Sequence, residues 1–319
     1  MTTKILAIVG SDRSGSTVLD NILGGIPGAF SGGEIRYLWE RGIVERRLCG
    51  CGEPVAACPV WSRVLSSVPE PSRDAVTVLA DLEYLRTRHA FSDTVPVFGS
   101  RYRAKVGEIA AKIAPVYHAL AAETGAEVIV DSSKRPTWAR LLSAMPDVDV
   151  SVVHLIRDPR AVSHSRKRFK RQLDSSDEIS MRQHPPVVSA TFWTVWNLAA
   201  NRLAGDGYLR VRYEDLMADP VGSVDRIRAL AGLDQPHPTL TSTSVELQPS
   251  HTVSGNPARF STGEVALRSD DAWRRDQNGG DRLITDLLTL PLARSYGYGE
   301  LRQSRNLVGA TGPVEQEIE

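Results

Sequence analysis

Residues 5–17 place a short apolar run directly before a turn that contains two glycines, Gly10 and Gly15. Five consecutive apolar residues predict a buried strand, and the residues after Gly15 predict the start of a helix. A turn of this kind aims backbone N–H groups and the positive end of the helix at one anion. The chain must therefore fold so that this turn lies at the edge of a sheet, where we expect a phosphate-binding loop.

The spacing in this turn is Gly-x-x-x-x-Gly-x-Ser/Thr, which is that of a nucleotide phosphate loop. Ser16 stands where an ATP- or GTP-hydrolysing enzyme has its lysine. Arg13 supplies a cation from inside the loop instead, and Ser16 and Thr17 add hydroxyl donors. The loop favours a nucleotide ligand and disfavours ordinary triphosphate chemistry.

A second apolar run enters a polar turn and a helix at residues 150–165. From Arg157 to Arg171 there are seven Lys or Arg and one Asp, in a chain whose formal net charge is zero. The sequence therefore predicts two separate anion sites. One nucleotide with phosphates at two ends would occupy both.

With these two segments, the chain resembles the sulfotransferases that use 3′-phosphoadenosine 5′-phosphosulfate (PAPS), and in particular their bacterial, carbohydrate and tyrosyl-protein branches. The resemblance assigns the 5′-phosphosulfate to residues 13–17 and the 3′-phosphate to Arg157 and Ser165, which have the family's spacing. It extends to residues 211–216, similar to the family's Tyr-Glu-Asp-Leu strand end. Residues 250–260 are similar to its late nucleotide-covering loop.

The resemblance implies an enzyme that transfers a sulfuryl group from PAPS to a hydroxyl by in-line displacement, leaving 3′-phosphoadenosine 5′-phosphate (PAP) and needing no metal ion. The nucleotide-binding residues that it implies are Ser11, Arg13, Ser14, Gly15, Ser16, Thr17, Arg157, Ser165, Tyr213, Gly255, Asn256 and Arg259.

Sulfuryl transfer requires a base for the acceptor hydroxyl and positive charge for the leaving phosphate. Glu34 is the predicted base, because a short connection after the first helix can return it beside the loop. Tyrosyl-protein and some bacterial carbohydrate sulfotransferases have a glutamate at a similar place. The histidine that serves as base in the aryl and steroid branch has no equivalent in residues 131–134. Lys134 and Arg13 are the predicted catalytic cations.

His251 competes with Glu34 as a residue on the acceptor side, because it immediately precedes the glycine-containing part of residues 250–260. If Glu34 is only a helix cap or a surface residue, His251 becomes the leading candidate for the base.

Strands and helices alternate along the chain, so we expect an α/β fold of three layers, P-loop-like, with a central, mainly parallel sheet flanked by helices. Core strands are expected at residues 5–9, 128–131, 151–156 and 209–212, with a short extended piece at 29–31. Ligands of such sheets gather at the carboxyl ends of the strands.

We expect residues 1–303 to form a single domain with a helical insertion at about residues 65–123, and residues 304–319 to form a flexible tail. Neutral net charge argues against nucleic acid as a partner. No apolar run is long enough to span a membrane, and residues 1–4 lead directly into the first strand, so we expect a cytoplasmic protein.

The three cysteines, Cys49, Cys51 and Cys58, lie in one Gly- and Pro-containing segment. Three close thiols suggest zinc, but a closed structural site has four ligands and no histidine lies nearby in sequence. We therefore expect no metal, and favour a loop of free thiols or a strained disulfide. Similar loops in bacterial members of the resembled family imply a place near the acceptor.

Two other functions remain open at this point: a kinase-like, nucleotide-dependent phosphotransferase on the same fold, and a nucleotide-binding protein without catalysis. The missing loop lysine disfavours the phosphotransferase. For a sulfotransferase, a carbohydrate or another small molecule is the preferred acceptor, with a lipid-linked sugar and a peptide tyrosine as alternatives.

Overall fold

A five-stranded parallel sheet forms the centre of the molecule, with the strand order β2-β3-β1-β4-β5. The computed structural model describes residues 2–86, 96–169, 171–174 and 182–298. The strands of the sheet are β1 (Thr3–Val9), β2 (Ala29–Gly33), β3 (Val128–Lys134), β4 (Val148–Ile156) and β5 (Tyr208–Arg212).

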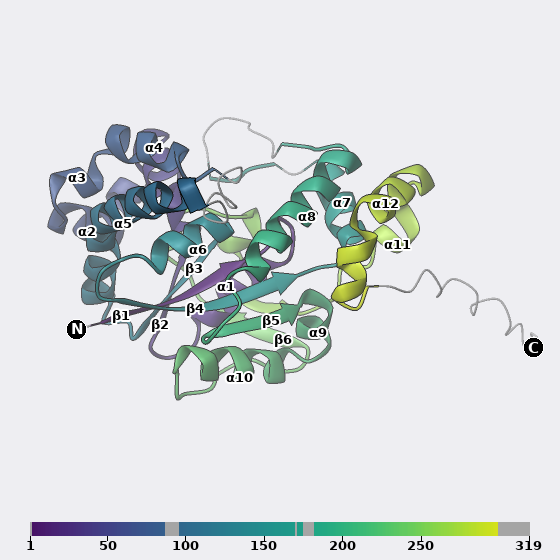
Figure 1. Cartoon of the computed structure of the whole chain (residues 1–319). Coiled ribbons are helices and arrows are strands. Elements are labelled where there is room, and N and C mark those ends of the chain that lie inside the picture. The colour runs from purple at the N-terminus through teal and green to yellow at the C-terminus, as the bar shows by residue number, and fades with distance from the viewer. Residues whose placement is uncertain (1, 87–95, 170, 175–181, 299–319) are drawn as a thin grey trace, which may run out of the picture.

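Helices cover both faces of this sheet (Figure 1), which confirms the predicted three-layer α/β fold. The α-helices of the described residues are α1 (Ser16–Gly24), α2 (Trp61–Ser67), α3 (Glu70–Arg73), α4 (Ala75–Glu83), α5 (Pro96–Thr124), α6 (Pro136–Leu142), α7 (Pro159–Lys167), α8 (Pro186–Asn201), α9 (Tyr213–Ala218), α10 (Pro220–Ala231), α11 (Trp273–Asp276) and α12 (Gly279–Ser295).

Strand β1 lies in the middle of the sheet and is buried on both faces. Ile5 and Ala7 join a hydrophobic cluster with residues of α5 and α6, whereas Leu6 and Ile8 join a second cluster with residues of α1 and α10. Successive side chains of a strand point to opposite faces, so a continuous apolar run is what a doubly covered strand requires.

The strands have the predicted positions with longer bounds, and β3 continues to Lys134, which therefore belongs to the strand and not to the turn after it. The structure adds an antiparallel ribbon of β6 (Ser244–Leu247) and β7 (Gly263–Ala266), which the sequence did not predict. These two strands have four residues each, too few for a clear alternation of apolar and polar side chains.

Helices α2 to α5 occupy the region of the predicted helical insertion, and residues 87–95 of that region lie outside the described residues. The predicted tail, residues 304–319, also lies outside them, and the single-domain organisation stays a prediction. In the part of the chain that the structure describes, no helix combines the length and the apolar character needed to cross a membrane.

Asp20 of α1 gives a pH-dependent test of the packing of α1 on β2. Its side chain is buried and accepts a hydrogen bond of 2.6 Å from Ser31 Oγ. Burial raises the pKa of Asp20 to about 7, so the folded protein retains a proton that the unfolded chain loses near pH 4.

We expect the stability of the native protein relative to Asp20→Asn to fall as the pH rises from about 4 to 7, by up to about 1.4 kcal/mol per pH unit, and then to level off. Denaturant unfolding of both proteins across this range measures the difference. Asp149→Asn, at an exposed position of β4, controls for the substitution itself. A difference that stays constant with pH would contradict the assignment.

Candidate active site

A cavity of about 450 Å³ lies at the carboxyl ends of the sheet strands. Four of the five strands contribute a lining residue at their last position or directly after it: Glu34 after β2, Lys134 in β3, Arg157 after β4 and Tyr213 after β5. Arg13 lines the cavity from the loop that follows β1. Parallel strands end at the same edge of a sheet, so residues far apart in sequence meet there.

Of the fifteen predicted site residues, eleven line this cavity and four do not. Those that line it are Arg13, Gly15, Ser16, Thr17, Glu34, Lys134, Arg157, Ser165, Tyr213, Gly255 and Asn256. The other four are Ser11, Ser14, Arg259 and His251, and their positions are described below.

The phosphate-loop sequence forms a tight turn that ends on α1. Gly15 is the N-cap of α1 with a φ of 94°, and a Cβ atom built on it would lie 2.5 Å from the Tyr213 ring. A side chain at this position is therefore excluded twice, by the backbone conformation and by the close ring. Ser11 and Ser14 are buried within the turn.

Glu34 and Lys134 form an ion pair inside the cavity, with Lys134 Nζ donating to Glu34 Oε1. Both side chains are about nine-tenths buried, at 9% and 12% exposure. Burial alone would lower the pKa of Lys134, but the negative charges of Glu34 and Asp12 outweigh it and raise that pKa. Lys134 is therefore a permanent cation beside the predicted base.

Both predicted catalytic cations, Arg13 and Lys134, have a strained backbone conformation. Arg13 and Lys134 each have a φ of 67°, in the left-handed region that costs a non-glycine residue about 1–3 kcal/mol. At Lys134 the strain accompanies a register shift between β1 and β3, after which Val9 pairs with Lys134. The irregularity redirects the end of β3, and a bulge commonly re-aims a side chain in this way.

Arg157 connects the phosphate loop to a segment near the end of the chain. Its guanidinium donates to the backbone oxygen of Arg13 at 3.2 Å and to that of Asp270 at 3.0 Å, and it lies 4.4 Å above the Tyr213 ring. The Asp270 carboxylate is 3.3 Å from the same guanidinium. Ser165, on α7, lines the cavity with Arg157. That the two residues bind a 3′-phosphate stays a prediction.

Residues 250–260, which we call the late loop, approach the cavity beside Glu34. Gly255 and Asn256 line the cavity, and the backbone oxygen of Ser254 accepts a hydrogen bond from the Glu34 amide. Arg259 does not line the cavity. Its buried guanidinium donates to the backbone oxygens of Thr252 and Leu48 and so braces the loop.

His251 also lies away from the predicted catalytic residues. Its Nδ1 atom is 3.3 Å from Cys58 Sγ, and its ring stacks on Phe30 with centroids 6.5 Å apart. The sequence-based interpretation of the cysteines assumed that a fourth ligand would have to lie close in sequence. The structure instead brings a histidine to Cys58 from 193 residues further along the chain.

Several cavity residues were not selected from the sequence: Asp12, Tyr37, Arg41, Arg47, Arg166, Gln172, Arg182, His184 and Asp270. Arg166 belongs to the basic run that the sequence did identify. Arg41 comes from the short π-helical segment η2 (Leu38–Val44), where it donates to Ser254 Oγ, and Arg47 follows it. The lining comprises seven Lys or Arg side chains and three carboxylates, so the cavity favours an anion with several negative charges.

A phosphate-type loop lies between β1 and α1 and opens into a basic cavity at the strand ends, where α/β proteins with parallel sheets commonly bind anionic ligands. A model of the sulfotransferase family matches residues 6–237. The match covers more than half of the chain, and the protein therefore belongs to the sulfotransferase family. This membership does not favour the phosphotransferase alternative.

Two kinds of relative accompany this match. Carbohydrate sulfotransferase 4 from Mus musculus is 28% identical over an alignment of 145 residues, and the match covers 40% of this chain and 37% of the mouse protein. The chain thus matches little more than a third of that relative's length. A sulfotransferase domain from the Synechococcus PCC 7002 olefin synthase has a TM-score of 0.51 at 22% identity, covering 93% of this chain and 95% of that domain. That likeness supports the fold.

Replacing Gly15 by alanine tests the close approach of the loop to Tyr213. Because the Cβ atom would meet the ring and the φ is positive, Gly15→Ala should lower the free energy of unfolding by roughly 1–3 kcal/mol, measured by denaturant titration. Gly205→Ala is the matched control, since a Cβ atom there has no neighbour within 4 Å. Equal effects of the two substitutions would argue against this packing.

Proposed function

We propose that this protein is a PAPS-dependent sulfotransferase that transfers a sulfuryl group to a hydroxyl of a carbohydrate or other small molecule. The observation that supports this most directly is that the phosphate loop lines the same cavity as Arg157 and Ser165. Arg13 in the loop and Arg157 are 144 residues apart in the sequence. A nucleotide with anionic groups at its 5′ and 3′ ends needs two such sites, whereas ATP needs the loop alone.

The residues present fit such a nucleotide. Arg157 lines the cavity, and its Nε atom is buried without a hydrogen-bond partner among the described residues. A buried, unsatisfied donor of this kind costs free energy that a phosphate oxygen would recover. The surplus of positive charge in the lining agrees with a ligand of several negative charges.

In the proposed reaction, the acceptor oxygen attacks the sulfur atom opposite the bridging oxygen of the phosphosulfate. The new O–S bond forms as the S–O bond to the 5′-phosphate breaks, and the electron pair of the broken bond leaves with PAP. The hydroxyl proton passes to Glu34. Negative charge grows on the leaving phosphate, where Lys134 and Arg13 are positioned to stabilise it.

The ion pair of Glu34 with Lys134 contributes both to removal of the hydroxyl proton and to stabilisation of the leaving phosphate. It holds the Glu34 carboxyl group in a buried place at the cavity, where the group can accept the hydroxyl proton. As Glu34 becomes neutral, the Lys134 charge is released to the leaving group. One short contact thus links removal of the proton to neutralisation of the phosphate.

The proposed acceptor, a carbohydrate or other small molecule, is supported by fewer observations than the proposed nucleotide. The mouse relative is named as a carbohydrate sulfotransferase, but it aligns over only 37% of its length. A carbohydrate or small molecule with a free hydroxyl is the class to screen first, with a peptide tyrosine as the comparison.

Calorimetric titration with PAP tests the nucleotide assignment. The wild-type protein should bind PAP more tightly than ATP with magnesium. The double variant Arg157→Ala, Ser165→Ala should weaken PAP binding by roughly 10- to 100-fold, because it removes charge-assisted hydrogen bonds to the 3′-phosphate. Arg168→Ala removes the same charge from an exposed position of the basic run and should change the affinity little. Preference for ATP and magnesium would contradict the proposal.

Substitution of the predicted base separates binding from catalysis. Glu34→Gln should leave PAP binding intact and lower kcat by roughly 10²- to 10⁴-fold, because the amide cannot accept the hydroxyl proton. The rate of PAP formation with an active acceptor measures this. Glu40→Gln, an exposed position on η2, is the matched control. Full activity of Glu34→Gln would contradict the assignment and place the base elsewhere in the cavity.

A further inference from the structure

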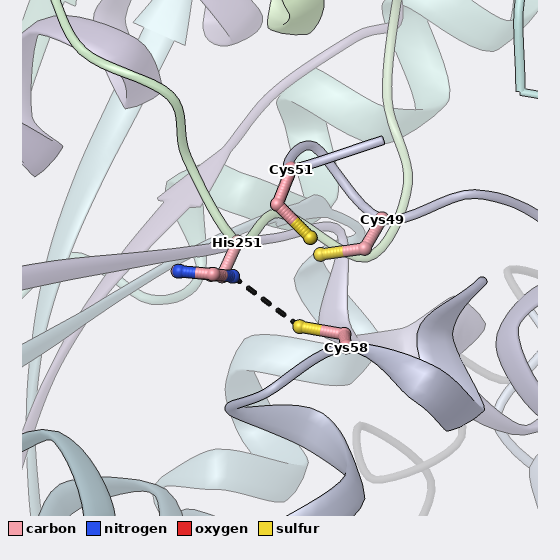
Figure 2. A group of neighbouring side chains, drawn as sticks. All are labelled: Cys49, Cys51, Cys58 and His251. Carbon is pink, nitrogen blue, oxygen red and sulfur yellow. Dashed lines mark hydrogen bonds between the residues drawn. The ribbon is translucent and has the colours of Figure 1, made fainter. Parts of the chain in front are cut away.

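Three cysteines and one histidine meet at a point outside the catalytic cavity (Figure 2). Cys49, Cys51 and Cys58 come from one segment, which we call the cysteine loop (residues 49–58), and His251 comes from the late loop. The four ligand atoms lie within 4.8 Å of one another, and Figure 2 shows the three sulfur atoms and the imidazole facing a common centre.

The spacing of these atoms is close to that of a tetrahedral zinc site. With Zn–S bonds of about 2.3 Å and a Zn–N bond of about 2.0 Å, the edges of the tetrahedron measure roughly 3.5–3.8 Å. The observed separations reach 4.8 Å at most, and that of Cys58 Sγ from His251 Nδ1 is 3.3 Å. Shifts of about 1 Å or less along each edge would complete the tetrahedron.

The donor set also selects the metal. Thiolate and imidazole ligands favour zinc over the oxygen-seeking calcium and magnesium ions. Four protein ligands close the coordination shell, so the site is of the structural kind and has no position left for substrate. Cys49 and Cys58 are fully buried, Cys51 and His251 are half-buried, and all three thiols are free of disulfides.

Backbone N–H groups lie beside two of the three sulfur atoms. Backbone N–H groups of Val60 and Trp61 donate to the Cys58 sulfur, and the N–H of Cys51 donates to that of Cys49. Amide donors of this kind stabilise thiolate charge and orient the ligands around a metal.

Two further contacts hold the histidine in place. The indole Nε1 of Trp61 donates to the backbone oxygen of His251 at 2.6 Å, and Phe30 stacks on the imidazole. The buried Arg259 guanidinium lies within electrostatic range of Cys49. Three thiolates and one neutral imidazole would leave a zinc complex with one net negative charge. The nearby Arg259 guanidinium already pairs with the Asp174 carboxylate at 3.4 Å.

We propose that Cys49, Cys51, Cys58 and His251 bind one zinc ion that fastens the cysteine loop to the late loop. The two loops already touch, since the Gly50 amide donates to the backbone oxygen of Thr252 at 2.9 Å. The ion would fix the late loop three residues before Ser254, which contacts the Glu34 amide. Its role is to position the late loop against the catalytic cavity, with no part in the chemical step.

Metal analysis of the wild-type protein is the first test. Protein purified without chelators and without a histidine tag should contain about one zinc ion per chain by plasma mass spectrometry. After removal of the metal under reducing conditions, added Co²⁺ should give the intense visible absorption of tetrahedral thiolate coordination. Neither measurement needs donor or acceptor, so the outcome is independent of the proposed sulfotransferase activity.

Variants assign the ligands. Cys58→Ala and His251→Ala should each reduce the bound zinc by about tenfold or more, and His118→Ala, a histidine on α5 remote in sequence from both loops, should retain it. If the ligand variants do not fold, the Co²⁺ titration of the wild-type protein decides the matter. Wild-type protein that takes up neither Zn²⁺ nor Co²⁺ when reduced would overturn the proposal. So would a native disulfide among the three cysteines, or bound iron with labile sulfide.

Discussion

The buried ion pair between Glu34 and Lys134 is the contact on which the arrangement of the cavity at the strand ends depends. A charged group out of water is strongly unfavourable unless its partner is correctly placed, so each residue fixes the position of the other. Their placement requires two local departures from regular structure: the positive φ of Gly33 directly before Glu34, and that of Lys134 in β3. The strained backbone is stable because the surrounding strands are packed on both faces by helices.

Most of the fold and much of the cavity could be predicted from the sequence, because the signals are local. A continuous apolar run predicts a doubly covered strand, and the glycine spacing after it predicts the loop that holds Gly15 against Tyr213. Once a parallel sheet is assumed, geometry brings the strand ends together, so the meeting of Arg13, Lys134 and Arg157 follows from three separate local predictions. Their chemical roles stay predictions.

The rest depends on contacts between distant segments, which leave no local signal. Arg41 joins the cavity because a π-helical turn after Glu34 aims it at the late loop, and nothing in the residues around it indicates that turn. His251 meets the cysteines only because the late loop folds back over β2, and its sequence distance from Cys58 had argued against a metal. Arg259 looked like a ligand for an anion, yet its hydrogen bonds are used in bracing two loops.

The contact of Arg157 with Asp270 has a further consequence for any anion that enters the cavity. The Asp270 carboxylate already forms an ion pair with the Arg157 guanidinium. Partial burial would raise the pKa of Asp270, but the positive charge of Arg157 outweighs burial and lowers that pKa. An incoming phosphate therefore competes with the Asp270 carboxylate for Arg157. The free energy of binding gained is the difference between the Arg157–phosphate pair and the Arg157–Asp270 pair. The same competition assists departure, since Asp270 can reclaim the arginine as the ligand leaves. Ligand exchange at this end of the cavity therefore replaces one partner of Arg157, the Asp270 carboxylate, by another, the phosphate. The buried Arg157 cation is never left without an anionic partner.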